Sequence, residues 1–255
     1  MKVLNDLFLG VKTYGTALAF ISKHKLWHFF FFPVLIGLFL MVLAYFSIDY
    51  AVQQFNLFTE GWLSIDTDSD DWWNISKGVF GTLLHVLIRL GLIFIYLTIN
   101  KYLVLILVSP VLALLSERVD QILSGKSYPF DGDQFFRDVL RGILIALRNM
   151  FLEFGIIFLV FILSIIFPFI SPFTAIFLLL VEFYFYGFSL LDYTNERRRL
   201  KISQSVRFIR KNKGIAIGNG AMFSLIFLVP LLGMIVAPIV GVVAATLAVH
   251  NRTEV

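Results

Sequence analysis

Two charged side chains stand in apolar surroundings, where each needs a counter-charge or a polar partner. Arg89 lies near the middle of residues 78–100. A charge at the centre of a bilayer costs at least about 2.5–3.5 kcal/mol, so it is usually turned inward, paired or functional. On a helix, His85, Tyr96 and Asn100 lie within about 60° of Arg89. The stripe predicts an ion pathway, a hydrogen-bonding contact between helices, or an arginine that snorkels to the interface.

Glu182 is the second such charge, ten residues after Pro172. A buried carboxyl either raises its pKa and stays neutral or finds a cation. Arg89 is the mid-span cation that could pair with Glu182. The pair would act as a static brace or as a site for proton or ion coupling, and the sequence leaves both open.

The turn at Ser171-Pro172 could point the N-terminus of a half-helix into the membrane. Free N–H groups and the positive end of the helix dipole favour an anion there. Pro238 could do the same from a second hairpin. Alternatively, both turns wedge between the long helices and are capped locally.

Several kinds of chemistry lack the residues they need. The chain has no cysteine, which removes disulfides, thiolate metal sites and cysteine nucleophiles. His24 and His28 lie one helical turn apart, but no carboxylate lies within a turn of them, so we expect packing rather than metal binding. No catalytic triad, HExxH motif, phosphate loop or carboxylate pair is present. We therefore expect neither an enzyme nor a cofactor.

The composition indicates an integral membrane protein. Of 255 residues, 59% are hydrophobic and 15% are charged, against roughly 25% charged in soluble domains. We expect residues 1–255 to form a single polytopic membrane domain in contact with the lipid bilayer. The formal net charge of +4 arises from loops and does not indicate nucleic-acid binding.

The apolar pattern predicts an all-α fold with two long spanning helices, residues 29–48 and 78–108. Two further stretches, 154–181 and 214–249, carry no charge and contain two prolines each. They are too long for one crossing of about 20 residues and too short for two. We expect proline-broken, re-entrant helical hairpins. Six short but complete crossings are the alternative.

Arm lengths underlie the re-entrant prediction. Residues 155–167 would form roughly 20 Å of helix, and residues 239–249 roughly 16 Å. A small residue followed by proline recurs three times, and this pattern predicts that each proline opens a helix. The pairs are Ser109-Pro110, Ser171-Pro172 and Ala237-Pro238. The amphipathic pattern at residues 4–22 predicts a helix that lies at the membrane surface. The charges of Glu117, Arg118 and Asp120 suit an interfacial or cytosolic helix over residues 111–123.

Lysine and arginine counts predict the orientation. Residues 192–213 carry eight and residues 49–77 carry one. We expect a multi-pass protein of the inner (plasma) membrane, with both termini cytoplasmic and the acidic loop 56–76 outside. The basic linker 192–213 would meet anionic headgroups or a partner.

Three motifs occur in a distinctive order. A proline-led run spans residues 109–117, Leu191-Asp192-Tyr193 precedes the basic linker, and residues 228–233 precede Ala237-Pro238. In these features the chain resembles the CysZ-type sulfate transporters, in the superfamily with eukaryotic etoposide-induced membrane proteins. The resemblance implies a helical bundle with partly inserted hairpins, a homo-oligomer, and passage of sulfate.

One departure concerns the substrate. Sulfate-binding members of that family carry a glycine, an apolar residue and one or two arginines just before the first span. The corresponding residues here are Lys25-Leu26-Trp27-His28. The glycine and the arginines are replaced, but the place stays basic through Lys23, Lys25 and His28.

The leading prediction is a transporter or channel for a small inorganic anion, with sulfate suggested by the resemblance. Its candidate pathway residues are Arg89, His85, Asn100, Glu182, Ser171, Lys25 and His28. The alternative is a non-transporting scaffold that organises lipids or partners. Transport needs a continuous polar path, whereas a scaffold can have a dry core.

Overall fold

A computed structural model describes residues 2–60, 72–125, 131–198, 200–229 and 232–253, which are almost entirely helical and contain no strand. The helices are α1 (Lys2–Lys23), α2 (Phe31–Glu60), α3 (Trp72–Ser124), α4 (Gly132–Ile166), α5 (Ser171–Arg197), α6 (Ile202–Lys211), α7 (Lys213–Phe227) and α8 (Leu232–Thr253). Short 3₁₀ helices at Leu26–Phe30 and Pro168–Ile170 precede α2 and α5. The predicted all-α fold is confirmed.

Helices long and apolar enough to cross a membrane confirm the multi-pass class. They cover Leu26–Ala51, Tyr102–Ser124, Gly132–Ile166, Pro172–Glu196 and Leu232–Arg252 within the described part of the chain. The first agrees with the predicted span 29–48. The second predicted span, 78–108, falls inside the much longer helix α3.

The chain divides into two compact units. Unit 1 contains Met1–Gly37 and Tyr102–Val255, and unit 2 contains Leu38–Lys101. Unit 2 holds most of α2 and the first part of α3, and unit 1 holds everything that forms the candidate site below. A single domain over residues 1–255 stays a prediction.

Pro110 does not open a helix, contrary to the prediction. Helix α3 runs through it for 53 residues, about 80 Å at 1.5 Å per residue. Proline removes one backbone hydrogen bond from a helix, but Val108, Leu112 and Leu115 are fully buried around it. Packing on both sides therefore holds the helix together, and residues 111–123 are not a separate helix.

Pro238 also lies inside a helix rather than at its start. Helix α8 has 22 residues, about 33 Å, so the predicted 16 Å arm over 239–249 is wrong. Ala237, Ile239 and Val240 are fully buried beside the proline, and their packing again overrides the local break. Pro172, by contrast, occupies the first turn of α5 as predicted.

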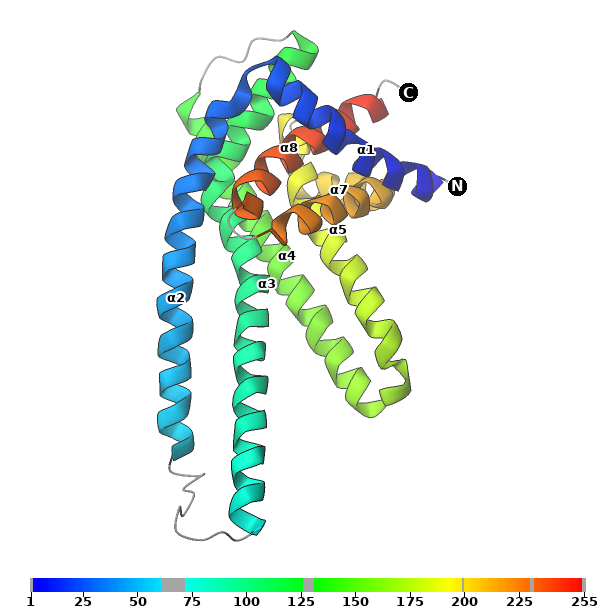
Figure 1. Cartoon of the computed structure of the whole chain (residues 1–255). Coiled ribbons are helices and arrows are strands. Elements are labelled where there is room, and N and C mark those ends of the chain that lie inside the picture. The colour runs from blue at the N-terminus through cyan, green and yellow to red at the C-terminus, as the bar shows by residue number, and fades with distance from the viewer. Residues whose placement is uncertain (1, 61–71, 126–130, 199, 230–231, 254–255) are drawn as a thin grey trace. The chain divides into compact units, whose positions relative to one another are not determined.

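The first hairpin has longer arms than expected. Helix α4 continues without a break for 35 residues, about 52 Å, so the predicted 20 Å arm at 155–167 is wrong. Figure 1 shows α4 and α5 running side by side to the turn that joins them. In the second hairpin, α7 has only 15 residues, about 22 Å. Re-entrance stays a prediction for both.

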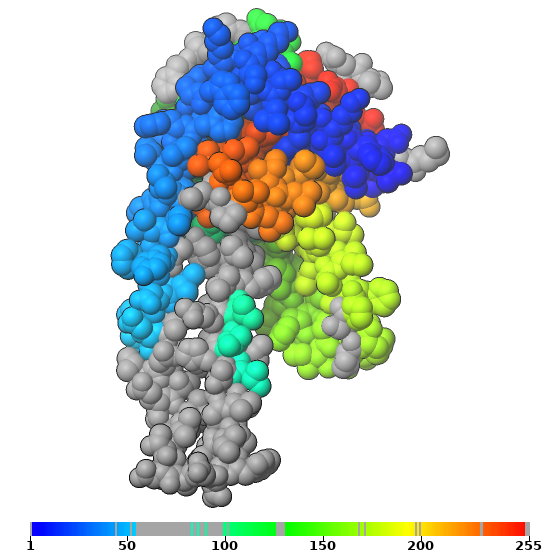
Figure 2. All heavy atoms as spheres, viewed as in Figure 1, coloured from blue at the N-terminus to red at the C-terminus, as the bar shows by residue number. Residues whose placement is uncertain are grey.

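Helix α7 lies at the centre of unit 1, packed against α1, α5 and α8. Figure 2 shows α1 in blue lying along α7 in orange. Glycines permit these close crossings: a Cβ on Gly220 would stand 1.7 Å from the Phe183 carbonyl oxygen, and one on Gly187 1.8 Å from that of Ala216. Such backbone contact is typical of helix packing in membranes.

Helix α1 turns its small and polar side toward the protein. The buried positions on this side are Asp6, Gly10, Thr13, Tyr14, Ala17 and Ile21. Leu4, Phe8 and Leu18 are exposed on the opposite side. The Asp6 carboxylate meets the Arg252 guanidinium at 3.6 Å, which ties α1 to α8. The amphipathic helix is confirmed, and its place at the membrane interface stays a prediction.

Candidate functional site

Polar side chains from α3, α4, α5 and α6 lie in a row inside unit 1. We call this row of side chains the polar seam. Its members are Tyr102, Arg141, Arg148, Asn149, Glu153, Glu182, Tyr186, Ser189, Asp192, Asn195 and Ser205. The α5 members recur three or four residues apart, which places them on one helix face. From Glu182 to Asn195 they extend about 20 Å along the helix.

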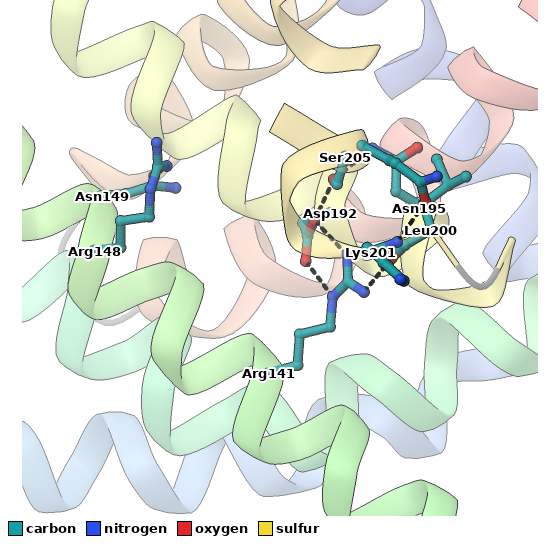
Figure 3. A network of polar contacts seen from close by, with 9 residues as sticks. Arg141, Arg148, Asn149, Asp192, Asn195, Leu200, Lys201 and Ser205 are labelled. Atoms are coloured by element: carbon teal, nitrogen blue, oxygen red, sulfur yellow. Dashed lines mark hydrogen bonds and ion pairs between the residues drawn. The ribbon is translucent and has the colours of Figure 1, made fainter. Parts of the chain in front are cut away.

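One end of the seam is built around Arg141 on α4 (Figure 3). Its Nε and Nη2 donate to Oδ2 and Oδ1 of Asp192, each at 3.0 Å. Its Nη1 donates to the Leu200 carbonyl, just before α6. The Asp192 side chain is 3% exposed. This two-pronged contact is a strong form of ion pair, and it joins α4, α5 and the connector to α6.

The remaining bonds of Asp192 lead into α6. The Ser205 hydroxyl donates to Asp192 Oδ1, and Asn195 Nδ2 donates to Ser205 Oγ at 2.9 Å. Ser205 and Asn195 are fully buried. The Arg141 charge is therefore matched by Asp192, and hydrogen bonds through Ser205 and Asn195 extend this cluster into α6.

The middle of the seam joins α4 to α5 through Asn149. Its Nδ2 donates to Ser189 Oγ at 2.9 Å, and its Oδ1 accepts from Arg148 Nη1 at 3.0 Å. The Arg148 guanidinium lies 5.4 Å from the centre of the Phe188 ring. Figure 3 shows Arg148 and Asn149 apart from the Arg141 cluster. Arg148 is thus held by an amide and an aromatic face.

Two carboxyl groups lie at the other end of the seam. The Tyr102 hydroxyl donates to Glu153 Oε2, and the Tyr102 and Tyr186 rings lie 5.1 Å apart. The Ser224 hydroxyl of α7 donates to Glu182 Oε1 at 3.3 Å. Glu153 is 2% exposed, and Glu182 is half-buried.

The seam stops where the apolar part of the hairpin begins. No charged residue occurs over 154–181, and aromatic side chains such as Phe158, Phe169 and Phe173 are exposed by 66–74%. Large exposed apolar surfaces need lipid or a partner to cover them. The hairpin therefore combines a polar base inside unit 1 with an apolar tip suited to the bilayer.

The predicted pathway residues fall in several places. The side chains of Arg89, His85 and Ser171 lie outside the described residues, so the Arg89–Glu182 pair stays a prediction. Asn100 belongs to unit 2 and is fully buried. Glu182 is a member of the polar seam.

Lys25 and His28 are exposed in the connection between α1 and α2. Lys25 is the described non-glycine residue with positive φ, at φ 54° and ψ 42°, a conformation that glycine adopts without steric cost. The His28 ring packs 4.4 Å from that of Phe29, and the His24 ring 4.4 Å from that of Phe20. No metal-binding group of three is found among the described residues.

Arg141 and Arg148 were not among the predicted pathway residues, although the sequence carries a signal for them. They lie seven residues apart, which is about two turns and one face of a helix. Asn149 falls beside that face. Ser189 and Asp192, the partners of Asn149 and Arg141, follow the hairpin turn at about the same distance in sequence as Asn149 and Arg141 precede it. The folding of the hairpin onto itself would have paired them.

Comparison with known proteins supplies the family. A family model described as "Sulfate transporter CysZ/Etoposide-induced protein 2.4" matches residues 13–238. Comparison with curated proteins gave no match. The matched segment contains all of the polar seam and both hairpin turns, so the chain belongs to the family of the sulfate transporter CysZ and etoposide-induced protein 2.4.

Proposed function

We propose that this protein carries a small inorganic oxyanion, sulfate by family resemblance, across the membrane as a transporter or channel. The family match supports the class of function. A multi-pass arrangement of apolar helices supports a place in the bilayer. The inner membrane, cytoplasmic termini and a homo-oligomer belong to the same proposal.

The polar seam is the observation that favours transport over a scaffold. Burying polar groups is costly unless they are hydrogen-bonded, and in lipid their presence commonly marks a substrate or ion path. Unit 1 contains two buried or half-buried arginines on the same face of α4, Arg141 and Arg148. A scaffold that only organises lipid has no need of such a polar interior.

The pathway proposal includes residues beyond the seam. Arg89 and His85 would lead the anion along α3 towards Asn100, and Ser171 would offer a helix N-terminus at the hairpin turn. Lys25 and His28 would provide a basic entrance, with Glu182 as the counter-charge to Arg89. The positive residues attract the anion, and the carboxylate limits how tightly it binds.

Uptake of radiolabelled sulfate by proteoliposomes tests the function directly. We expect uptake well above that of protein-free liposomes, competed by other tetrahedral oxyanions and unaffected by uncharged solutes of similar size. Uptake equal to that of protein-free liposomes, from protein that elutes as a folded species, would reject transport and favour the scaffold.

Two variants test the role of Arg89. Arg89→Gln keeps hydrogen bonding but removes the charge, so flux should fall while the protein still folds if Arg89 attracts the anion. If Arg89 only braces Glu182, the single variant should lose stability by leaving a carboxylate unpaired. Arg89→Gln with Glu182→Gln should then regain stability and flux. Normal flux in the single variant removes Arg89 from the pathway.

A further inference from the structure

Helices α1 and α6 expose cations on sides that carry no exposed carboxylate. Residues 197–213 contain no aspartate or glutamate. The one acid of α1, Asp6, is buried and paired with Arg252. The exposed cations on α6 and its flanks are Lys201, Arg207, Arg210, Lys211 and Lys213, and those on α1 are Lys2, Lys12 and Lys23. Both helices therefore present positive charge alone to their surroundings.

The exposed side of α1 also carries large apolar side chains. Leu4, Phe8 and Leu18 are exposed by 58%, 62% and 46%, and they lie within about 80° of one another at 100° per residue. Lys12 stands at the edge of this face. Neither α1 nor α6, both fully described, is among the helices long and apolar enough to cross a membrane. An apolar face edged by cations is typical of a helix that lies at a membrane surface.

Packing at Gly214 brings the end of α6 next to the first turns of α1. Helix α6 ends at Lys211, and α7 begins at Lys213. A Cβ on Gly214 would stand 2.8 Å from the Cβ of Asp6 and 3.1 Å from the backbone nitrogen of Leu7. The start of α7 therefore lies directly against α1, and Figure 2 shows α1 in blue on the outside of unit 1. The cations at the end of α6 and the apolar face of α1 thus occupy neighbouring places on the surface of unit 1.

The opposite side of α6 is fixed to the protein. The Ser205 hydroxyl donates to the Asp192 carboxylate, and the Arg198 guanidinium lies 5.0 Å from the centre of the Phe208 ring. These contacts set the rotation of α6 about its axis, so its cations face outward before anything binds them. A surface held in place in this way loses little conformational freedom on binding.

Charge and apolar surface together identify what covers these helices. An acidic soluble protein would attract the cations but would leave Leu4 and Phe8 without an apolar partner. A bilayer that contains anionic lipids offers negative charge to the cations and acyl chains to the apolar side chains. Other helices of unit 1 are long and apolar enough to stand in that bilayer. The combination therefore favours a lipid surface.

We propose that α1 and α6 form a surface that recognises an anionic membrane leaflet. Leu4 and Phe8 enter the boundary between headgroups and acyl chains, and Lys211 and Lys213 lie among the headgroups. The cations are spread along two helices, so the surface responds to the summed charge of many lipids rather than to one bound anion. The inference is independent of the proposed function, because a protein that moves no solute would need the same surface to sit in such a membrane.

Lipid retention by the full-length protein tests the role of charge. The protein is purified in a neutral detergent with equal amounts of phosphatidylglycerol and phosphatidylcholine, and native mass spectrometry counts the lipids that stay bound. The wild type should retain mostly phosphatidylglycerol. Lys211→Gln with Lys213→Gln should lower this preference roughly tenfold or more, since each cation near an anionic surface contributes about 1 kcal/mol. Lys211→Arg with Lys213→Arg keeps both charges and should keep the preference.

Arg118→Gln with Arg137→Gln is the matched control for general surface charge. Both arginines are exposed, but they stand on α3 and α4 beside Glu117, Asp120 and Asp133. The preference for phosphatidylglycerol should therefore equal that of the wild type. An unchanged preference in the double lysine-to-glutamine variant, or an equal loss in the arginine control, would overturn recognition by the end of α6. Melting temperatures of all variants exclude unfolding as the cause.

Depth measurements test the apolar half of the surface. The chain has no cysteine, so Phe8→Cys and Ser203→Cys each carry a single nitroxide label in nanodiscs that contain phosphatidylglycerol. Oxygen concentrates in hydrocarbon and should relax the label at position 8 more than a water-soluble nickel chelate does. The label at position 203, on the exposed side of α6, should show the reverse.

Two outcomes of this measurement would overturn the lipid surface. A label at position 8 that is relaxed mainly by the nickel chelate would place the outer side of α1 in water. A label there that neither reagent reaches would mean that a second copy of this chain covers α1. Relaxation by oxygen at position 8, together with the lipid preference lost only in the lysine-to-glutamine pair, supports the surface.

Discussion

Arg141 and Arg148 lie on the same face of α4, yet their surroundings give them different roles. Arg141 is bound to the Asp192 carboxylate and the Leu200 carbonyl, so its charge is used inside the fold. Arg148 contacts the Asn149 amide and the Phe188 ring, so its charge remains available. One arginine therefore holds helices together, and the other can meet an anion.

The rest of the molecule supports this division. Near Arg141, an ion pair and hydrogen bonds join α4, α5 and the connector to α6. At α7, the helices are held by backbone contacts at glycines that leave no space for a methyl group. With both regions fixed by packing and pairing, Arg148 can keep its charge beside the Asn149 amide and the Phe188 ring without being needed for stability.

The largest expected effect comes from breaking the Arg141 pair. Arg141→Gln leaves the 3% exposed Asp192 carboxylate without its cation, and breaking a buried pair in this way costs about 3–5 kcal/mol. We expect a clearly lower unfolding temperature in detergent. Adding Asp192→Asn should restore most of the loss, since two neutral amides need no counter-charge. A single variant that unfolds like the wild type would contradict a structural role.

Lys25 tests how a strained backbone conformation, rather than a side-chain contact, affects stability at a basic residue. A left-handed conformation costs non-glycine residues roughly 1–2 kcal/mol, and Lys25 adopts it at φ 54°. Lys25→Gly should therefore raise the unfolding temperature modestly. Lys25→Ala keeps the strain while removing the charge, so it should not stabilise. Equal effects of the two changes would mean that charge, rather than backbone conformation, decides the stability at this position.

Tyr14 supplies a neutral reference for these charged contacts. Its buried hydroxyl donates to the Asn219 carbonyl oxygen at 2.9 Å. Burial raises the pKa of the Tyr14 phenol, so the group stays protonated and keeps donating. Tyr14→Phe should cost about 1 kcal/mol, as typical for a neutral hydrogen bond, and should leave sulfate binding unchanged. A loss as large as that of Arg141→Gln would remove the distinction between neutral and charged contacts.

The sequence predicts the all-helical membrane fold because the chain has few charged residues. The length and helical spacing of its apolar stretches therefore decide the fold class. It predicts the start of α5 at Pro172 because little packs around that turn. It fails at Pro110 and Pro238, where fully buried neighbours hold the helix through the proline. Local propensity yields there to tertiary packing.

The site was harder to foresee than the fold. Arg141 and Asp192 are 51 residues apart, and their pairing depends on the register between α4 and α5. Helix α6 joins the same cluster through the Leu200 carbonyl and the Ser205 hydroxyl, and these contacts also depend on that register. Single side chains such as Glu182 stand out in an apolar stretch, whereas contacts between helices require the packing that brings them together.

Sulfate uptake by proteoliposomes with Arg148→Gln beside Arg207→Gln tests the division of roles most directly. Both proteins should unfold at nearly the wild-type temperature, because neither arginine forms an ion pair with a carboxylate among the described residues. We expect Arg148→Gln to lower the initial rate roughly tenfold or more, in line with one charge-assisted hydrogen bond, and Arg207→Gln to keep the wild-type rate. A wild-type rate in Arg148→Gln would contradict the claim that the unpaired arginine of α4 handles the anion.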